Sequence, residues 1–128
     1  MAVNYIAYNP NPTGKNVGDC TVRAIAKATG KSWGDIYLAL AMQGYRDGDM
    51  PSANAVWGAY LHSLGYSRHI VPDTCPLCYR VEDFARDHPT GTYILALSGH
   101  VVCVKDGNLY DSWPSQRETV LYYWERND

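Results

Sequence analysis

The sequence predicts an α+β fold, because helix-type patterns come first and strand-type patterns follow them. A helix-forming stretch begins at Cys20, and apolar residues recur at helical spacing after Ser52. From Thr92 onward the pattern becomes that of strands, with Asp106-Gly107 as a hairpin signal. Helices followed by an antiparallel sheet are typical of α+β proteins. We therefore expect N-terminal helices, with Cys20 at a helix start, packed on a C-terminal antiparallel sheet.

Four helices are expected, each from its own start or stop signal. The first begins near Asp19 or Cys20 and ends at Gly30, a favourable residue just past a helix end. The second opens at Ser32, which has the carboxylate of Asp35 three residues on, and runs to about residue 44. The third is capped by Ser52 and ended by Gly65, and the fourth covers 81–88, before a proline.

Strand patterns occupy six segments. The first alternates near the N-terminus, the second is short, and the remaining four are rich in Val, Ile, Leu and Tyr. Proline and asparagine in 9–14 predict a loop after the first of them. The expected strands are 3–8, 67–71, 92–97, 100–105, 108–111 and 119–125.

Length and composition indicate a single domain that spans residues 1–128. The hydrophobic fraction is 46% and the charged fraction 19%, as in ordinary globular proteins. A net charge of −2 gives no electrostatic footprint for nucleic acid or for an anionic membrane. The sequence has no long apolar run and no signal-peptide pattern at its start. We expect a cytoplasmic protein, or one in a host cytoplasm if its source is a phage.

Cys20, His100 and Asp111 carry the functional prediction. Cys20 follows a glycine turn that begins at Asn16, His100 heads one expected strand, and Asp111 ends the next. A helix N-terminus and a nearby imidazolium both favour a thiolate. Because one hairpin joins His100 to Asp111, the carboxylate can reach the imidazole ring across the strands. A thiol, an imidazole and an orienting carboxylate form the arrangement of a cysteine nucleophile.

These segments resemble the papain-like cysteine peptidases. That family has a Cys at a helix start, then a His that opens a strand, then an Asn or Asp on the next strand. Gly99-His100-Val101-Val102 is similar to the family's His element, and Asp111-Ser112-Trp113 resembles its third element with Asp in place of Asn. The resemblance implies that Cys20 is the nucleophile, His100 the general base and Asp111 the residue that orients it.

Two branches are closest in pattern. The small size and the Asp variant are similar to the bacterial leader-processing peptidases, and the segment Asp19–Ala24 resembles the Cys element of the ovarian-tumour deubiquitinases. The sequence departs from the family about six residues before Cys20, where Gly14 replaces the Gln whose amide helps to form the oxyanion hole. Asn16 is the nearest amide and is the expected substitute, together with the backbone N–H of Cys20.

Other chemistry-bearing residues leave alternatives open. Cys75 and Cys78 have the spacing of zinc ligands, but a second ligand pair is missing, so a loop thiol pair is the favoured interpretation. Arg23 either binds a substrate carboxylate or forms a salt bridge. Trp113 belongs to the core or covers the His–Asp pair and excludes water. Cys103 is expected to point inward from its strand.

We therefore expect a cysteine hydrolase that cleaves a peptide or isopeptide bond through a thioester, with Trp113 and Asn16 beside the triad. Transglutaminase-like transfer or deamidation by the same three residues is one alternative. A protein-binding module without catalysis on a papain-like frame is another. The expected partner is a peptide or protein substrate, with no cofactor, no nucleic acid and no membrane, and small size suits a phage or bacterial accessory protein.

Overall fold

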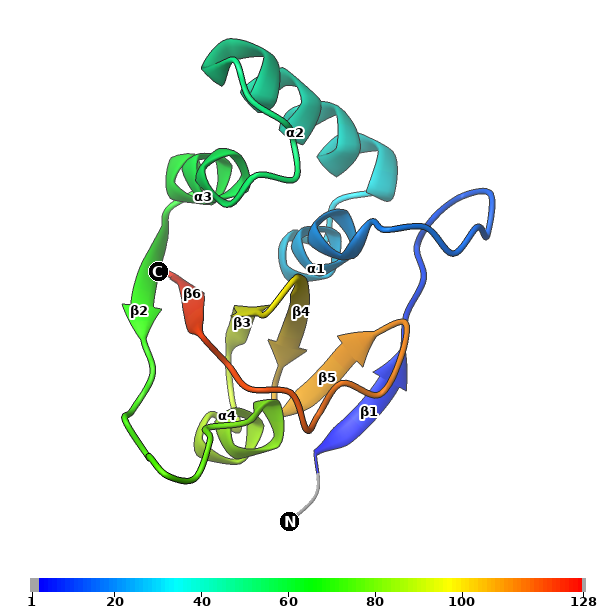
Figure 1. The fold of residues 1–128 in the computed structure, drawn as a ribbon. Coiled ribbons are helices and arrows are strands. Elements are labelled where there is room, and N and C mark those ends of the chain that lie inside the picture. The colour runs from blue at the N-terminus through cyan, green and yellow to red at the C-terminus, as the bar shows by residue number, and fades with distance from the viewer. Residues whose placement is uncertain (1–2, 128) are drawn as a thin grey trace.

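The computed structural model describes residues 3–127 and confirms the α+β class (Figure 1). Within this range the chain begins with one strand, continues through three helices, a second strand and a fourth helix, and ends in a run of four strands. The elements are β1 (Asn4–Ala7), α1 (Cys20–Thr29), α2 (Trp33–Asp47), α3 (Asn54–Ser63), β2 (Tyr66–Ile70), α4 (Val81–Asp87), β3 (Thr92–Leu97), β4 (His100–Lys105), β5 (Asn108–Asp111) and β6 (Tyr122–Arg126).

The strands form one sheet in the order β1-β5-β4-β3-β6-β2. All neighbours are antiparallel except β1 and β5, which run parallel. The expectation of a C-terminal antiparallel sheet is therefore wrong in two respects: the sheet is mixed, and its edge strands, β1 and β2, both precede the C-terminal run of strands. Alternation predicts a strand at 3–8, but the choice of partner and direction depends on where the intervening helices return the chain.

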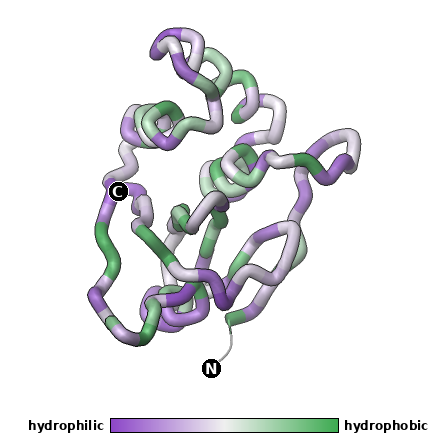
Figure 2. The backbone as a smooth tube through the Cα atoms, in the orientation of Figure 1, coloured by the Kyte–Doolittle hydropathy of each residue, from purple (hydrophilic) through white to green (hydrophobic). Residues whose placement is uncertain are grey.

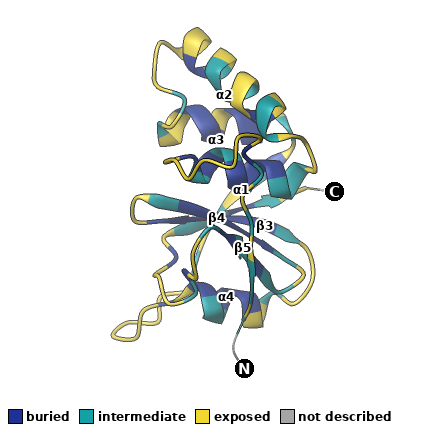
Figure 3. Ribbon diagram, turned by 90° about the vertical axis from the view of Figure 1, so that its right-hand side faces the viewer, coloured by how far each residue is buried: buried dark blue, intermediate teal, exposed yellow. Residues whose placement is uncertain are grey.

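Helices cover both faces of the sheet. Figure 3 shows α1, α2 and α3 on one side and α4 on the other, with the buried residues of the strands between them. The first side buries Ile25, Trp57 and Leu61 against Ile94 and Trp124 of the sheet. Removal of this apolar surface from water is the main stabilising contribution to the layer.

The smaller cluster lies under α4. Phe84 contacts the opposite face of the sheet, where Leu95, Val102 and Leu109 project. Alternate residues of the central strands thus enter opposite clusters, which is why both strands are apolar along most of their length (Figure 2). Cys103 is fully buried on the α1 side, as expected from its strand position.

The signals for α1 and α2 worked as local chemistry predicts. Gly30 has φ 74° and closes α1, and the Ser32 side chain accepts a hydrogen bond from the Asp35 N–H at the start of α2. The strands 92–97, 100–105 and 108–111 have the expected bounds. Their hairpin turn holds Asp106 at φ 51° and Gly107 at φ 77°, the backbone of a type I′ turn.

Three boundaries differ from expectation. Ala53, not Ser52, occupies the cap position of α3, and no side chain caps that helix. The last strand begins at Tyr122 rather than at residue 119, because Thr119 makes only an isolated bridge to Arg80. The second helix continues three residues past Gly44, up to Asp47. Smaller shifts of one residue affect both ends of β1 and of β2, and the last residues of α4 and β6.

Candidate active site

Cys20 is the first residue of α1 and is partly buried. The first N–H groups of a helix have no carbonyl partner within the helix, so the Cys20 N–H is available to an incoming oxygen. Gly18, two residues earlier, lines the same cavity as Cys20. The glycine turn before the helix thus leaves the thiol and the helix N-terminus open to a substrate, and a thiolate there also interacts favourably with the helix dipole.

His100 and Asp111 are joined as the sequence predicts. The His100 Nε2 lies 2.7 Å from Asp111 Oδ2. The last hydrogen-bonded pair of the two strands is Cys103 with Tyr110, so Asp111 follows diagonally from His100 rather than directly opposite it. The hairpin therefore brings the carboxylate to the ring although the two residues do not share a register position.

The thiol of Cys20 completes the chain of contacts. It lines the same cavity as His100 and Val101, and both of these residues lower the pKa of the thiol. Because Nε2 of the ring is engaged by Asp111, Nδ1 is the nitrogen left for sulfur. The structure thus brings together a helix start, a strand start and a strand end. Cys20 is at least 80 residues away along the chain from both His100 and Asp111.

The electrostatics of the pair favour the charged forms. Burial raises the pKa of the Cys20 thiol, but hydrogen bonds from His100 and the Val101 N–H outweigh burial, and the pKa falls below its ordinary value. Burial lowers the pKa of His100, whereas its hydrogen bonds to Asp111 and Cys20 raise it, and the result is a pKa of about 9. These contacts therefore favour the thiolate–imidazolium form over the neutral pair.

Asp111 is held by more than the histidine. Burial alone raises the pKa of Asp111, but the hydrogen bonds from His100, from the Ser115 hydroxyl at 2.6 Å and from the Ser112 N–H at 2.7 Å lower it. The Arg23 guanidinium contributes a further contact at 3.3 Å. With the side chain almost fully buried, these donors replace the water that an ionised carboxylate requires.

Arg23 forms a salt bridge, which was one of the two interpretations of its position. It is 5% exposed and lies between Asp111 and Asp19, donating to both carboxylates. The second oxygen of Asp19 accepts a hydrogen bond from Trp33 Nε1 at 2.8 Å. The triad is thus connected through buried charges to the start of α2. From the sequence, Asp19 is expected only as a helix start and not as a partner of Arg23. Its spacing of four residues from Arg23 at the start of α1 is nevertheless a recognisable signal for such a pair.

Trp113 lies outside the core, so the core interpretation is wrong. Its side chain is 42% exposed, and its ring centroid is 5.1 Å from that of His100 with an interplanar angle of 31°. The indole therefore covers one side of the imidazole, as the alternative interpretation expected.

A cavity of about 310 Å³ opens beside the thiol and the imidazole. Asn54, at the start of α3, is one of its lining residues; its side-chain carbonyl accepts a hydrogen bond from Trp57 Nε1, which leaves the amide N–H₂ for the cavity. Asn16 is exposed in the loop before α1, and it is not among the described residues that line this cavity. The sequence offered no signal for Asn54, because only the packing of α3 brings it to Cys20.

The remaining thiols lie away from the site. Cys75 and Cys78 are exposed free thiols, and the described residues contain no group of three or more His, Cys, Asp or Glu side chains suited to a metal ion. Burial raises the pKa of Cys103 to about 12. None of the helices in the described part of the chain has the length and apolarity needed to cross a membrane.

Thiol, imidazole and carboxylate thus lie in sequence beside a cavity, in the order that activates a cysteine for attack on a carbonyl carbon. Comparison with known proteins gives no relative from which to extend this description: no family model, no curated protein and no solved structure matches the chain.

Proposed function

We propose that this protein is a cysteine hydrolase that cleaves a peptide or isopeptide bond. The observation that supports the proposal most directly is the arrangement of Cys20, His100 and Asp111. One ring nitrogen of His100 lies 2.7 Å from the carboxylate, and the thiol lines the same cavity as the ring and raises its pKa. The resemblance of the same three segments to papain-like peptidases, and the α+β architecture with Cys20 at a helix start, agree with this assignment.

The reaction follows from the geometry. The Cys20 thiolate attacks the carbonyl carbon, forming a C–S bond and moving the π electrons to oxygen. When that tetrahedral intermediate collapses, the C–N bond breaks and the His100 imidazolium gives its proton to the leaving amine. The neutral imidazole then takes a proton from water, whose oxygen attacks the thioester and releases the acid and the thiolate. Asp111 keeps the ring oriented throughout.

Two N–H groups are available to the oxyanion. The first is the Cys20 N–H at the start of α1, and the second is the Asn54 amide in the cavity. Asn16, the amide expected from the sequence, stays a prediction, and a paired substitution given in the Discussion tests it against Asn54.

The test of this proposal is the rate at which iodoacetamide alkylates Cys20 as a function of pH. Mass spectrometry separates its adduct from those of Cys75 and Cys78, which serve as exposed thiols within the same molecule. We expect labelling of Cys20 to stay fast below pH 7 and to slow in His100→Ala. Labelling no faster than that of the two loop thiols, and unchanged in the variant, would overturn the hydrolase and leave the binding module.

A second readout separates hydrolysis from acyl transfer. A peptide substrate is incubated with and without an added primary amine, and the products are identified by mass. Release of the free acid in both cases supports the hydrolase, whereas accumulation of the amide adduct supports transfer by the same three residues.

A further inference from the structure

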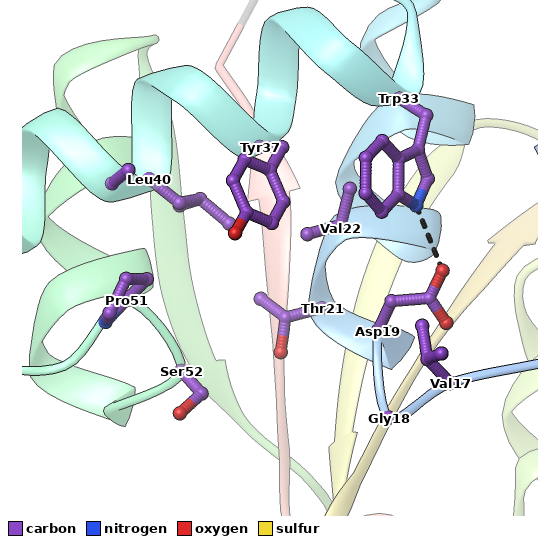
Figure 4. A pocket seen from close by; sticks show the side chains of 11 residues that line it. Val17, Gly18, Asp19, Thr21, Val22, Trp33, Tyr37, Leu40, Pro51 and Ser52 are labelled. Carbon is purple, nitrogen blue, oxygen red and sulfur yellow. Dashed lines mark hydrogen bonds between the residues drawn. The ribbon is translucent and has the colours of Figure 1, made fainter. Parts of the chain in front are cut away.

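A second cavity, of about 350 Å³, adjoins the one that holds Cys20 and His100 (Figure 4). It lies between α1, α2 and the segment that leads into α3. Gly18, Thr21 and Ser52 line both cavities, so the two share a wall at the first turn of α1. Each is within the size range of ligand pockets in proteins.

The lining of this second cavity is mostly apolar. Figure 4 shows Val17 and Val22 from the α1 side and Tyr37 and Leu40 from α2. Asp19 is the single carboxylate among its described lining residues, and both of its oxygens already accept hydrogen bonds, from Arg23 and Trp33. These walls suit an uncharged apolar group and disfavour a charged one, because no free counter-charge lines the cavity among the described residues.

The aromatic wall is held in place before any ligand arrives. The Trp33 indole is fixed by its 2.8 Å hydrogen bond to Asp19, and it stacks on Tyr37 with centroids 5.1 Å apart and planes inclined by 23°. Since Asp19 is also paired with Arg23, which contacts Asp111, the wall and the triad are parts of one rigid network. A preformed pocket reduces the ordering cost of binding.

The position of the cavity indicates which part of a substrate it receives. The leaving amine has to reach His100, which lies on the sheet side of Cys20. The acyl part of the substrate must therefore extend away from His100, and the α2 side of the first turn of α1 is where the second cavity opens. The acyl side chain is thus the group that this cavity can receive while the carbonyl carbon lies at the thiolate.

We propose that the cavity between α1 and α2 is a specificity pocket for a large apolar or aromatic side chain on the acyl side of the scissile bond. The proposal rests on the hydrolase function inferred above. It identifies the substrate class as peptides or protein tails with such a residue at or next to the cleaved bond.

The test uses short peptidyl chloromethyl ketones that alkylate thiols and carry Gly, Leu, Phe or Lys at either of the two positions nearest the electrophile. We expect Phe or Leu at one position to speed labelling of Cys20 by on the order of tenfold over Gly and Lys, as a filled apolar pocket does.

Ala41, which lines the cavity on α2, is replaced by Trp to fill it. Ala41→Trp should reduce the preference to within about twofold, whereas Leu38→Trp, on the exposed face of the same helix, should leave it intact.

Iodoacetamide labelling of Cys20 in every variant distinguishes the two failures. If iodoacetamide reacts rapidly but all peptidyl probes react alike, the pocket is overturned and the hydrolase stands. If iodoacetamide reacts slowly, the hydrolase itself is overturned, and the pocket with it.

Circular dichroism verifies folding, and Tyr37→Ala, at a half-exposed wall residue, is the second variant if Ala41→Trp does not fold. A preference that survives in both variants also contradicts the proposal.

Discussion

Asp111 is the residue on which the proposed site depends most. It is 2% exposed and meets His100, Ser115, Ser112 and Arg23 through its two oxygens. A buried carboxylate is tolerated only when donors replace its lost water, and here the donors come from a strand, a loop and α1. Orientation of the imidazole is therefore built into the packing rather than left to a single contact.

Replacing Asp111 by Asn tests this dependence. Asn keeps the shape but removes the charge that raises the pKa of His100, so the imidazolium and the thiolate it stabilises both become less favourable. We expect the labelling rate of Cys20 at pH 6 to fall by about tenfold or more, because one pKa unit changes the charged population tenfold. Asp106→Asn, in the hairpin turn, is the matched control and should label like the wild type; equal rates in both variants would contradict the assignment.

Asn54 and Asn16 are two candidates for the oxyanion amide, and substitution distinguishes them. Loss of one such donor typically costs on the order of 100-fold to 1000-fold in turnover. We expect Asn54→Ala to reduce peptide hydrolysis by about 100-fold while iodoacetamide labelling of Cys20 stays unchanged. Asn16→Ala should stay within about twofold of the wild type, because Asn16 is not among the described residues that line the cavity, whereas Asn54 is. The opposite pattern would return the role to Asn16.

At the scale of elements, the sequence was informative where a boundary depends on a few neighbouring residues. Gly30 and Ser32 act within one turn, and Asp106-Gly107 fixes the hairpin through its own backbone angles. The start of β6 was wrong because it depends on contacts across the fold: residue 120 donates to the carbonyl of Tyr79, outside the sheet, and the contact with β3 begins only where residue 121 donates to the carbonyl of Ala96. The parallel pairing of β1 with β5 was missed for the same reason.

The candidate site divides in the same way. The contact of His100 with Asp111 was predictable because a single hairpin connects them, and its partner Cys20 was predictable from the resemblance. Asn54 and Ser115 carried no signal in the sequence. Asn54 is 34 residues from Cys20 along the chain and shares a cavity with it only in the folded protein. The hydrogen bond of Ser115 to Asp111 depends on the conformation of the loop after β5. Sequence patterns thus indicated the three groups that the fold brings together, while the groups that hold and surround them required the folded chain.

Two glycines of α2 give a prediction at this scale. A Cβ on Gly44 would lie 2.7 Å from the Asp49 carbonyl oxygen, whereas a Cβ on Gly34 would meet only the Ser32 hydroxyl, at 4.0 Å. We expect Gly44→Ala to lower the free energy of unfolding by about 1–3 kcal/mol through overpacking. Gly34→Ala should raise it by about 0.5 kcal/mol through helix propensity. Urea denaturation measures both, and a stabilised Gly44→Ala would contradict the close approach of residues 49–51 to α2.

At the scale of the whole molecule, the site lies where α1 meets the sheet. Cys20 belongs to a helix on one face of the sheet, and His100 and Asp111 belong to the ends of two central strands. Their ion pair exists only when α1 is packed on the sheet, so the protonation of these groups is coupled to folding.

The coupling has two opposing contributions between about pH 6.5 and 9. His100 has a folded pKa of about 9, above its ordinary 6.5, so its contribution to stability is complete below pH 6.5 and is lost as the pH rises through 9. The folded pKa of Cys20 is below its ordinary 9.0, so its contribution is complete above pH 9 and is lost as the pH falls through the folded value. Within this window the contribution of His100 decreases with pH, and the contribution of Cys20 opposes that decrease above its folded pKa.

Removing the thiol should therefore expose the contribution of His100. In Cys20→Ser the hydrogen bond to Asp111 still raises the pKa of the imidazole, so the free energy of unfolding should fall between pH 6.5 and 8.5 by about 1–2 kcal/mol. The wild type should fall less steeply over the same range, as should Cys78→Ser, which removes an exposed thiol. Urea denaturation at pH 6.5, 7.5 and 8.5 measures the three slopes. Since a neutral thiol beside a neutral imidazole would show no difference between wild type and Cys20→Ser, equal slopes would mean that folding does not form the ion pair.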